Sequence, residues 1–123
     1  MIGVALGAFG AHALRESLIQ RQTANLWQTA VIYHLLHAAC LLALAGKTAP
    51  DPGRLPSKVV AAAYCWMGGI ILFSGSLYGL ALGAPGLGPI TPMGGLLFLA
   101  GWMLVMIDAA TNRPEPQAPD RRG

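Results

Sequence analysis

The sequence predicts an all-α fold: an integral membrane bundle of four transmembrane helices, in which the first helix is short or truncated. From Val59 to Ile107, 49 consecutive residues include no Asp, Glu, Lys, Arg or His. Hydrophobic residues make up 54% of the 123 residues and charged residues only 11%, whereas about 25% are charged in ordinary soluble domains. Clusters of proline and glycine separate the apolar segments from one another. A soluble chain of this length could not bury so much apolar surface, so a lipid bilayer is the expected solvent.

Three of the four apolar segments are long enough to cross a bilayer. We expect helices over about residues 27–45, 58–82 and 92–110, because about 20 residues span a hydrocarbon core of about 30 Å. Helices are expected because lipid offers the backbone no hydrogen bonds and the sequence lacks the alternation of a β-barrel. Together with the first segment, these helices form one transmembrane domain over residues 1–110.

The first apolar segment, Met1 to Leu14, is shorter than the others. At about 1.5 Å per residue it spans only about 21 Å. We expect a helix over about residues 1–19, in which Arg15 extends its charge toward the lipid headgroups while the helix continues past it. A tilted, partial insertion is one alternative, and truncation of a longer natural segment is another.

The two ends of the last helix carry distinct signals. Thr91 can cap the free amides, and Pro92 then occupies the first helical position, where its missing N–H is harmless. Residues 111–123 contain three prolines and mixed charge, so we expect a disordered tail.

The distribution of Lys and Arg predicts the orientation. Arg15 and Arg21 precede the second helix, and residues 83–91 add no basic residue. The other side of the membrane carries six: Lys47, Arg54, Lys58, Arg113, Arg121 and Arg122. The positive-inside rule therefore places residues 46–58 and the tail in the cytoplasm. Because the basic residues flank apolar segments and do not share a face, the expected partner is the lipid bilayer and not nucleic acid.

Small residues at a spacing of four predict how the helices pack. Gly75, Gly79 and Gly83 form one such row, and Gly3 and Gly7 form another with Ala11. Rows of this kind let helix backbones approach closely in lipid, where van der Waals contact drives association. We expect these glycines to mediate helix packing, either within the bundle or with a second copy or another membrane protein.

The histidines are the candidate site. His34 and His37 are spaced i and i+3 on the second helix, so both imidazoles are expected on one face, with His37 near the bilayer midplane. His12 could approach that face if the first two helices are antiparallel neighbours. Neutral imidazoles at this depth suit a transition metal, a proton relay or another ligand. The alternative is that each imidazole hydrogen-bonds a neighbouring helix and determines packing, since no carboxylate accompanies them.

Five motifs resemble those of a known family in the same order. They are GAFGAHAL at Gly7–Leu14, WQTAVIYHLLH at Trp27–His37, FSGSLY at Phe73–Tyr78, ITPMGG at Ile90–Gly95, and Gly101-Trp102. This pattern is similar to the domain-of-unknown-function 423 family, the YgdD-like small inner-membrane proteins, whose eukaryotic relatives are called transmembrane protein 256. The resemblance implies a four-helix protein of the bacterial inner membrane and no particular reaction. Family members carry a longer apolar lead before the first motif, so a late start codon or a truncation is expected here.

Two classes of function follow from these observations. The first is a structural or accessory membrane component of unknown biochemical activity that needs no cofactor. The second is a binding or transport module for a metal ion, proton or small ligand, lined by His12, His34 and His37. An enzyme is not expected, because the sequence shows no Ser/His/Asp set, carboxylate pair or phosphate-binding loop.

Overall fold

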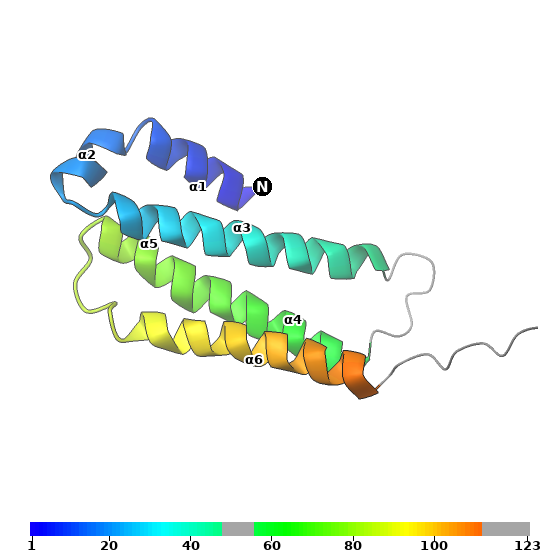
Figure 1. The fold of residues 1–123 in the computed structure, drawn as a ribbon. Helices are drawn as coiled ribbons and strands as arrows, with labels where there is room; N and C mark the ends of the chain where they lie inside the picture. Colours follow the sequence, from blue (N-terminus) through cyan, green and yellow to red (C-terminus); the bar gives the residue numbers. More distant parts are fainter. Residues whose placement is uncertain (48–55, 112–123) are drawn as a thin grey trace, which may run out of the picture.

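The computed structural model describes residues 1–47 and 56–111, and this part of the chain contains helices and no strand (Figure 1). In chain order the elements are α1 (Ile2–Ala11), α2 (Arg15–Gln20), α3 (Ala24–Lys47), α4 (Ser57–Gly69), the π-helical segment η1 (Ile70–Ser74), α5 (Gly75–Ala81) and α6 (Ile90–Thr111). Within these residues, three helical spans are long and apolar enough to cross a membrane: Ala24–Gly46, Ser57–Ala81 and Ile90–Thr111. The chain is therefore an all-α membrane bundle of three long helices with a short N-terminal one.

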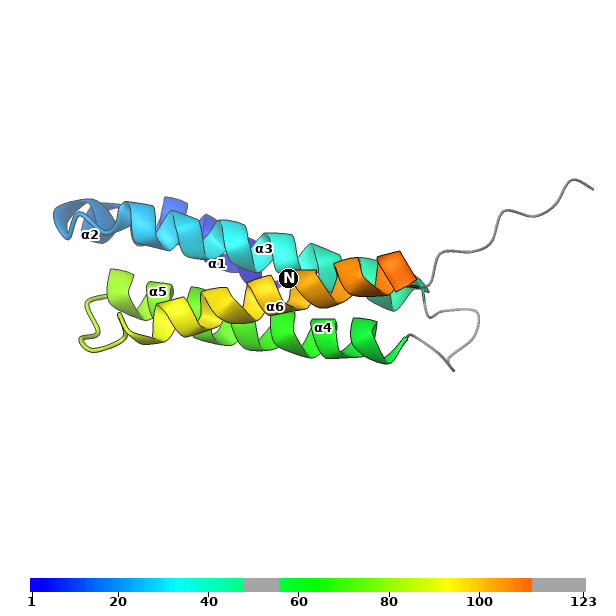
Figure 2. The same cartoon turned by 60° about the horizontal axis from the view of Figure 1, so that its bottom comes forward.

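The span formed by α4, η1 and α5 packs against both α3 and α6, while α1 lies along α3 (Figures 1 and 2). At one end of the bundle lie α2 and the connection between α5 and α6 (Figure 1). The end of α3, the start of α4 and the end of α6 lie together at the other end (Figure 1). Polar residues are concentrated at these two ends, as expected when the middle of each long helix lies in hydrocarbon.

The N-terminal segment differs from the single helix expected over residues 1–19. It is divided into α1 and α2, because the chain turns at His12–Leu14. The turn lets α2 fold back, so that Leu18, only 3% exposed, packs with Trp27 and Ala81. A straight helix would lose these van der Waals contacts. The described α1 has 10 residues, about 15 Å, and does not by itself span the bilayer.

The other helices also differ from their expected limits. α3 begins at Ala24 and ends at Lys47, so it is longer than 27–45 at both ends. The third span, Ser57–Ala81, lies within one residue of 58–82 at each end, but η1 interrupts its α-helical geometry. Of the expected tail, Thr111 ends α6 and the rest lies outside the described residues.

Thr91 is not the residue that caps α6, which corrects the sequence prediction. The amides of Ile90 and Thr91 already bond to the carbonyls of Leu87 and Gly88, so the helix begins at Ile90. The Thr91 hydroxyl instead lies 2.7 Å from the hydroxyl of Ser76 on α5. Pro92 lies in the first turn, where no helical N–H partner is needed.

The backbones of α6 and η1 lie in close contact at Gly94. A Cβ atom on Gly94 would collide with the backbone of Phe73 and of Leu72. Elsewhere a glycine faces a large ring: Gly101 meets Trp66, and Gly69 meets Phe98. Small residues facing large ones let membrane helices interdigitate without gaps. Contacts of this kind determine the position of α6 on the α4–η1–α5 span.

Replacing Gly94 by Ala should destabilise the bundle by about 1–3 kcal/mol, because the added methyl group can fit only if the two backbones separate. The neighbouring Gly95→Ala variant is the matched control, since its Cβ would lie 3.7 Å from the Phe73 ring, in ordinary contact. The midpoint of thermal unfolding in mild detergent measures both. Equal midpoints for the two variants would contradict this account of helix packing.

Candidate functional site

The three histidines do not meet. Gly3, near the start of α1, lies against His34 and Leu35, while Gly10 lies against Trp27, so α1 runs antiparallel to α3. His12 follows the end of α1 and is exposed, about 13 Å farther along the helix axis than Gly3. Among residues 1–47 and 56–111, no three His, Cys, Asp or Glu side chains lie close enough to hold a metal ion. The imidazoles therefore do not form the three-histidine site that the sequence suggested.

His37 is buried in the middle of the bundle, with 2% of its surface exposed. Its Nδ1 atom donates to the carbonyl oxygen of Tyr33 at 2.9 Å. The indole N–H of Trp102 donates to its Nε2 atom at 3.2 Å. Both bonds together require a neutral imidazole with its proton on Nδ1. Neither ring nitrogen is then available to a metal ion or a migrating proton unless one of these bonds breaks.

Aromatic rings surround this imidazole. The Phe98 ring stacks on it, with centroids 3.7 Å apart and planes 12° from parallel. The rings of Trp66 and Trp102 lie at 61° and 63° to the imidazole, with centroids 6.1 and 6.2 Å from it. The centroids of the two indoles are 4.9 Å apart. One side of this group opens into an apolar groove of about 710 Å³ between α3 and α6. His37 thus joins α3 to α6 within a packed aromatic group.

His34 faces different neighbours, although i, i+3 spacing places it on nearly the same side of α3. Its ring lies beside Tyr78 of α5, with centroids 6.4 Å apart, and α1 covers it at Gly3. Its Nδ1 atom is buried without a hydrogen-bond partner among the described residues, as are the hydroxyls of Tyr78 and Ser74. The two imidazoles therefore belong to two separate interfaces, and the geometry does not favour a histidine-lined conduit.

The glycine row of the third span does not form one packing face. Gly75 has open space around it within the described chain. Gly79 faces Leu87 in the connection to α6. Gly83 has φ +91° and lies beyond the helix, where its amide and that of Ala84 bond to the carbonyls of Leu80 and Gly79. This is a Schellman ending, in which glycine is preferred because it adopts positive φ without strain.

In α1, the small residues do lie against α3. Gly3 meets Leu35, Gly7 meets Val31, and Gly10 meets Trp27. The Trp27 indole N–H donates to the carbonyl of Leu6 at 3.1 Å. Trp27 is therefore part of the packed interior.

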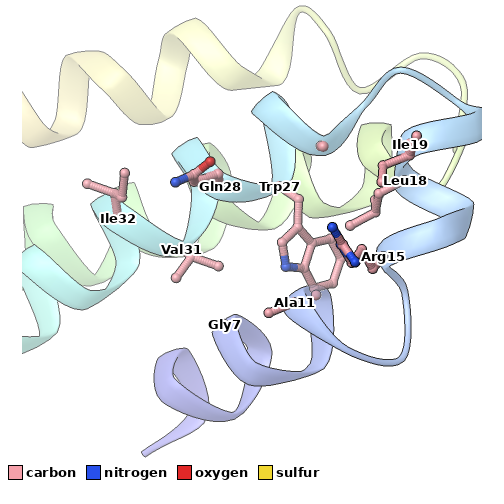
Figure 3. Close-up of a pocket in the computed structure, with 11 residues that line it drawn as sticks. Gly7, Ala11, Arg15, Leu18, Ile19, Trp27, Gln28, Val31 and Ile32 are labelled. Atoms are coloured by element: carbon pink, nitrogen blue, oxygen red, sulfur yellow. The ribbon is translucent and has the colours of Figure 1, made fainter.

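A groove that the sequence analysis did not predict lies between α1, α2 and α3 (Figure 3). We call it the α1–α3 groove, and its volume is about 460 Å³. Small residues of α1 form one wall, apolar residues of α2 and α3 form the others, and Arg15 and Gln28 supply its polar side chains. The feature of the sequence that points to this groove is Arg15, which closely follows a row of small residues. Only the turn at His12–Leu14 brings α1 and α2 together to form the groove.

Comparison with known proteins identifies the family. Residues 6–95 match the family described as Protein of unknown function (DUF423). The chain belongs to this family. UPF0382 membrane protein YwdK of Bacillus subtilis is 39% identical over 110 residues, covering 89% of this chain and 87% of that protein. A UPF0382 membrane protein of Haemophilus influenzae is 40% identical over 103 residues, covering 81% and 77%. No solved structure matches the chain.

The family extends beyond bacteria. UPF0382 membrane protein C1782.12c of Schizosaccharomyces pombe is 31% identical over 113 residues, covering 87% of this chain and 91% of that protein. The family resemblance seen in the sequence motifs is thereby confirmed. The relatives are named membrane proteins, so this chain is a multi-pass membrane protein of the same family.

The hydrogen bond between Trp102 and His37 should couple the two residues energetically. In a double-mutant cycle of His37→Phe and Trp102→Phe, the double variant should lose about 0.6–1.7 kcal/mol less stability than the sum of the single variants. Thermal or denaturant unfolding in detergent provides the free energies. Trp66→Phe is the matched control, since its indole N–H is buried without a partner in the described chain. If the coupling energy between His37 and Trp66 is as large as that between His37 and Trp102, the hydrogen bond is not the source of the coupling.

Proposed function

We propose that this protein is a structural or accessory component of the bacterial inner membrane and has no catalytic activity of its own. The observation that carries the proposal is the use of both His37 ring nitrogens within the bundle. His37 is the most deeply buried ionisable side chain among the described residues, and such residues mark transport or ligand sites by default. Here the imidazole joins two transmembrane helices, as a packing residue does.

An accessory role requires a surface for another membrane protein, and Gly75 supports one. It lies on the exposed side of α5, where a Cβ atom in its place would meet no other atom of the described chain within 4 Å. A second helix could approach the backbone closely there. The partner is a second copy of this chain or a helix of a larger complex.

The proposed orientation places the C-terminus in the cytoplasm. Its support is the excess of Lys and Arg in residues 46–58 and in the C-terminal residues over the segment that contains α2. The positive-inside rule relates such an excess to the cytoplasmic side. The end of the bundle that carries α2 then faces the outside of the membrane.

Metal analysis of gently purified protein tests the structural role of the histidines. We expect no stoichiometric metal, together with an unfolding midpoint that falls clearly in a His34→Ala/His37→Ala variant. The free energy of unfolding should fall by about 2–4 kcal/mol, because the stacking of Phe98 on the imidazole is lost and the Trp102 N–H is left unpaired. The exposed His12→Ala variant should leave the midpoint unchanged. One bound metal per chain that disappears in the double variant would overturn the proposal.

Gly75→Ile tests the accessory surface. Gly75 is exposed and a Cβ atom there meets no other atom of the described chain within 4 Å, so the thermal midpoint of the monomer should change little. Oligomer size, or the amount of any co-purifying membrane protein, should fall because the helix approach is blocked. Sedimentation in mild detergent and identification of co-purified proteins measure these quantities. If both are the same as in the wild type, Gly75 is not a contact surface.

A further inference from the structure

The α1–α3 groove has a polarity gradient. Arg15 and Ala11 lie near the polar end of the bundle, where α2 is found (Figures 1 and 3). From Ala24 to Ile32 the groove follows α3 for about 12 Å toward the bilayer interior. Its inner part is lined by apolar residues such as Val31 and Ile32. A cavity with a cationic mouth and an apolar interior, running along the membrane normal, suits an amphipathic occupant.

The groove is open because α1 contributes residues without large side chains. Gly7, Gly10 and Ala11 line it. Gly7 and Gly10 pack against Val31 and Trp27, whereas Ala11 is exposed, so a larger side chain such as Leu at position 11 would occupy the space. Its volume of about 460 Å³ falls within the range of about 300–1,000 Å³ that is usual for small-molecule sites. Opposite α1, the exposed Ile32 side chain extends the apolar wall along α3.

The charge of the groove lining indicates which class of ligand it binds. Arg15 is the only charged side chain in the lining, which includes no Asp or Glu. Arg15 is exposed, and no hydrogen bond or ion pair engages its guanidinium within residues 1–47 and 56–111. A guanidinium is well suited to bind phosphate in a bidentate manner. The group that complements this mouth is therefore an anionic phosphate.

We infer that the α1–α3 groove binds one anionic phospholipid, with the phosphate at Arg15 and an acyl chain along Gly7, Val31 and Ile32. The inference does not depend on the accessory role, since a lipid can occupy the groove in a monomer or in a complex. Gln28, which lies between the mouth and the inner part of the groove, is placed to hydrogen-bond the ester or glycerol region. The turn at His12–Leu14 is what creates the site, because it brings α2 over the end of α1.

Native mass spectrometry of the full chain in mild detergent tests the inference. Phosphatidylglycerol and phosphatidylcholine with the same acyl chains are the probes. The wild type should retain one lipid and prefer phosphatidylglycerol by about fivefold, the ratio that one basic residue contributes near a membrane surface. Arg15→Gln should abolish this preference. Arg21→Gln is the matched control, because Arg21 lies at the same end but over Gly83 and outside the groove, so the preference should persist.

The groove itself is tested by Ala11→Leu and, from the opposite wall, by Ala24→Leu. Both positions are exposed and line the groove, so either variant should fold and lose retention of both lipids. Unchanged thermal midpoints establish that the bundle is intact. If both variants retain lipid as the wild type does, the lipid binds elsewhere and the inference is overturned. An equal loss of preference in Arg15→Gln and Arg21→Gln would also overturn it, since diffuse surface charge would then explain the selectivity.

Discussion

The close approach of α6 to the α4–η1–α5 span is the constraint on which the rest of the bundle depends. At Gly94 the α6 backbone meets that of Phe73, and at Gly101 the Trp66 ring occupies the place of a side chain. Phe98, between these two glycines, then enters the bundle over Gly69 and reaches the imidazole of α3. In lipid, where apolar burial gives helices no advantage, van der Waals contact of this kind provides much of the association energy. A wider separation would disperse the aromatic rings.

Single hydrogen bonds join the helices in pairs. Trp102 on α6 donates to α3, and Trp27 on α3 donates to the α1 backbone. The Ser76 hydroxyl donates its proton to the carbonyl of Phe73. The Thr91 hydroxyl is therefore the donor in its bond with Ser76, and this bond joins α6 to α5. Such bonds in membrane proteins average only about 0.6 kcal/mol. They therefore contribute more to the register of the helices than to the stability of the bundle.

The end of the bundle with α2 is held by contacts between segments far apart in sequence. The hydroxyl of Thr23 donates to the carbonyl of Ala81 at 2.9 Å, at the end of α5. The guanidinium of Arg21 lies over Gly83, where its charge complements the negative end of the helix dipole. These contacts hold the start of α3 and the end of α5 together.

The sequence alone determined that the chain lies in a lipid bilayer, that it is all-α and that it contains long helices, because long apolar segments without charge are stable only in lipid. Its ordered motifs also indicated the family. It did not determine which residues face inward. In a soluble protein, the alternation of apolar and polar residues around a helix shows which face is buried. In a membrane both faces are apolar, so this alternation is weak. The spacing of Gly75, Gly79 and Gly83 therefore did not show that these glycines have different surroundings, while Gly94 and Gly101 gave no comparable signal. Likewise, only the packing of Leu18 against Trp27 and Ala81 decided that the first helix bends, and only the partners Tyr33 and Trp102 decided what His37 does.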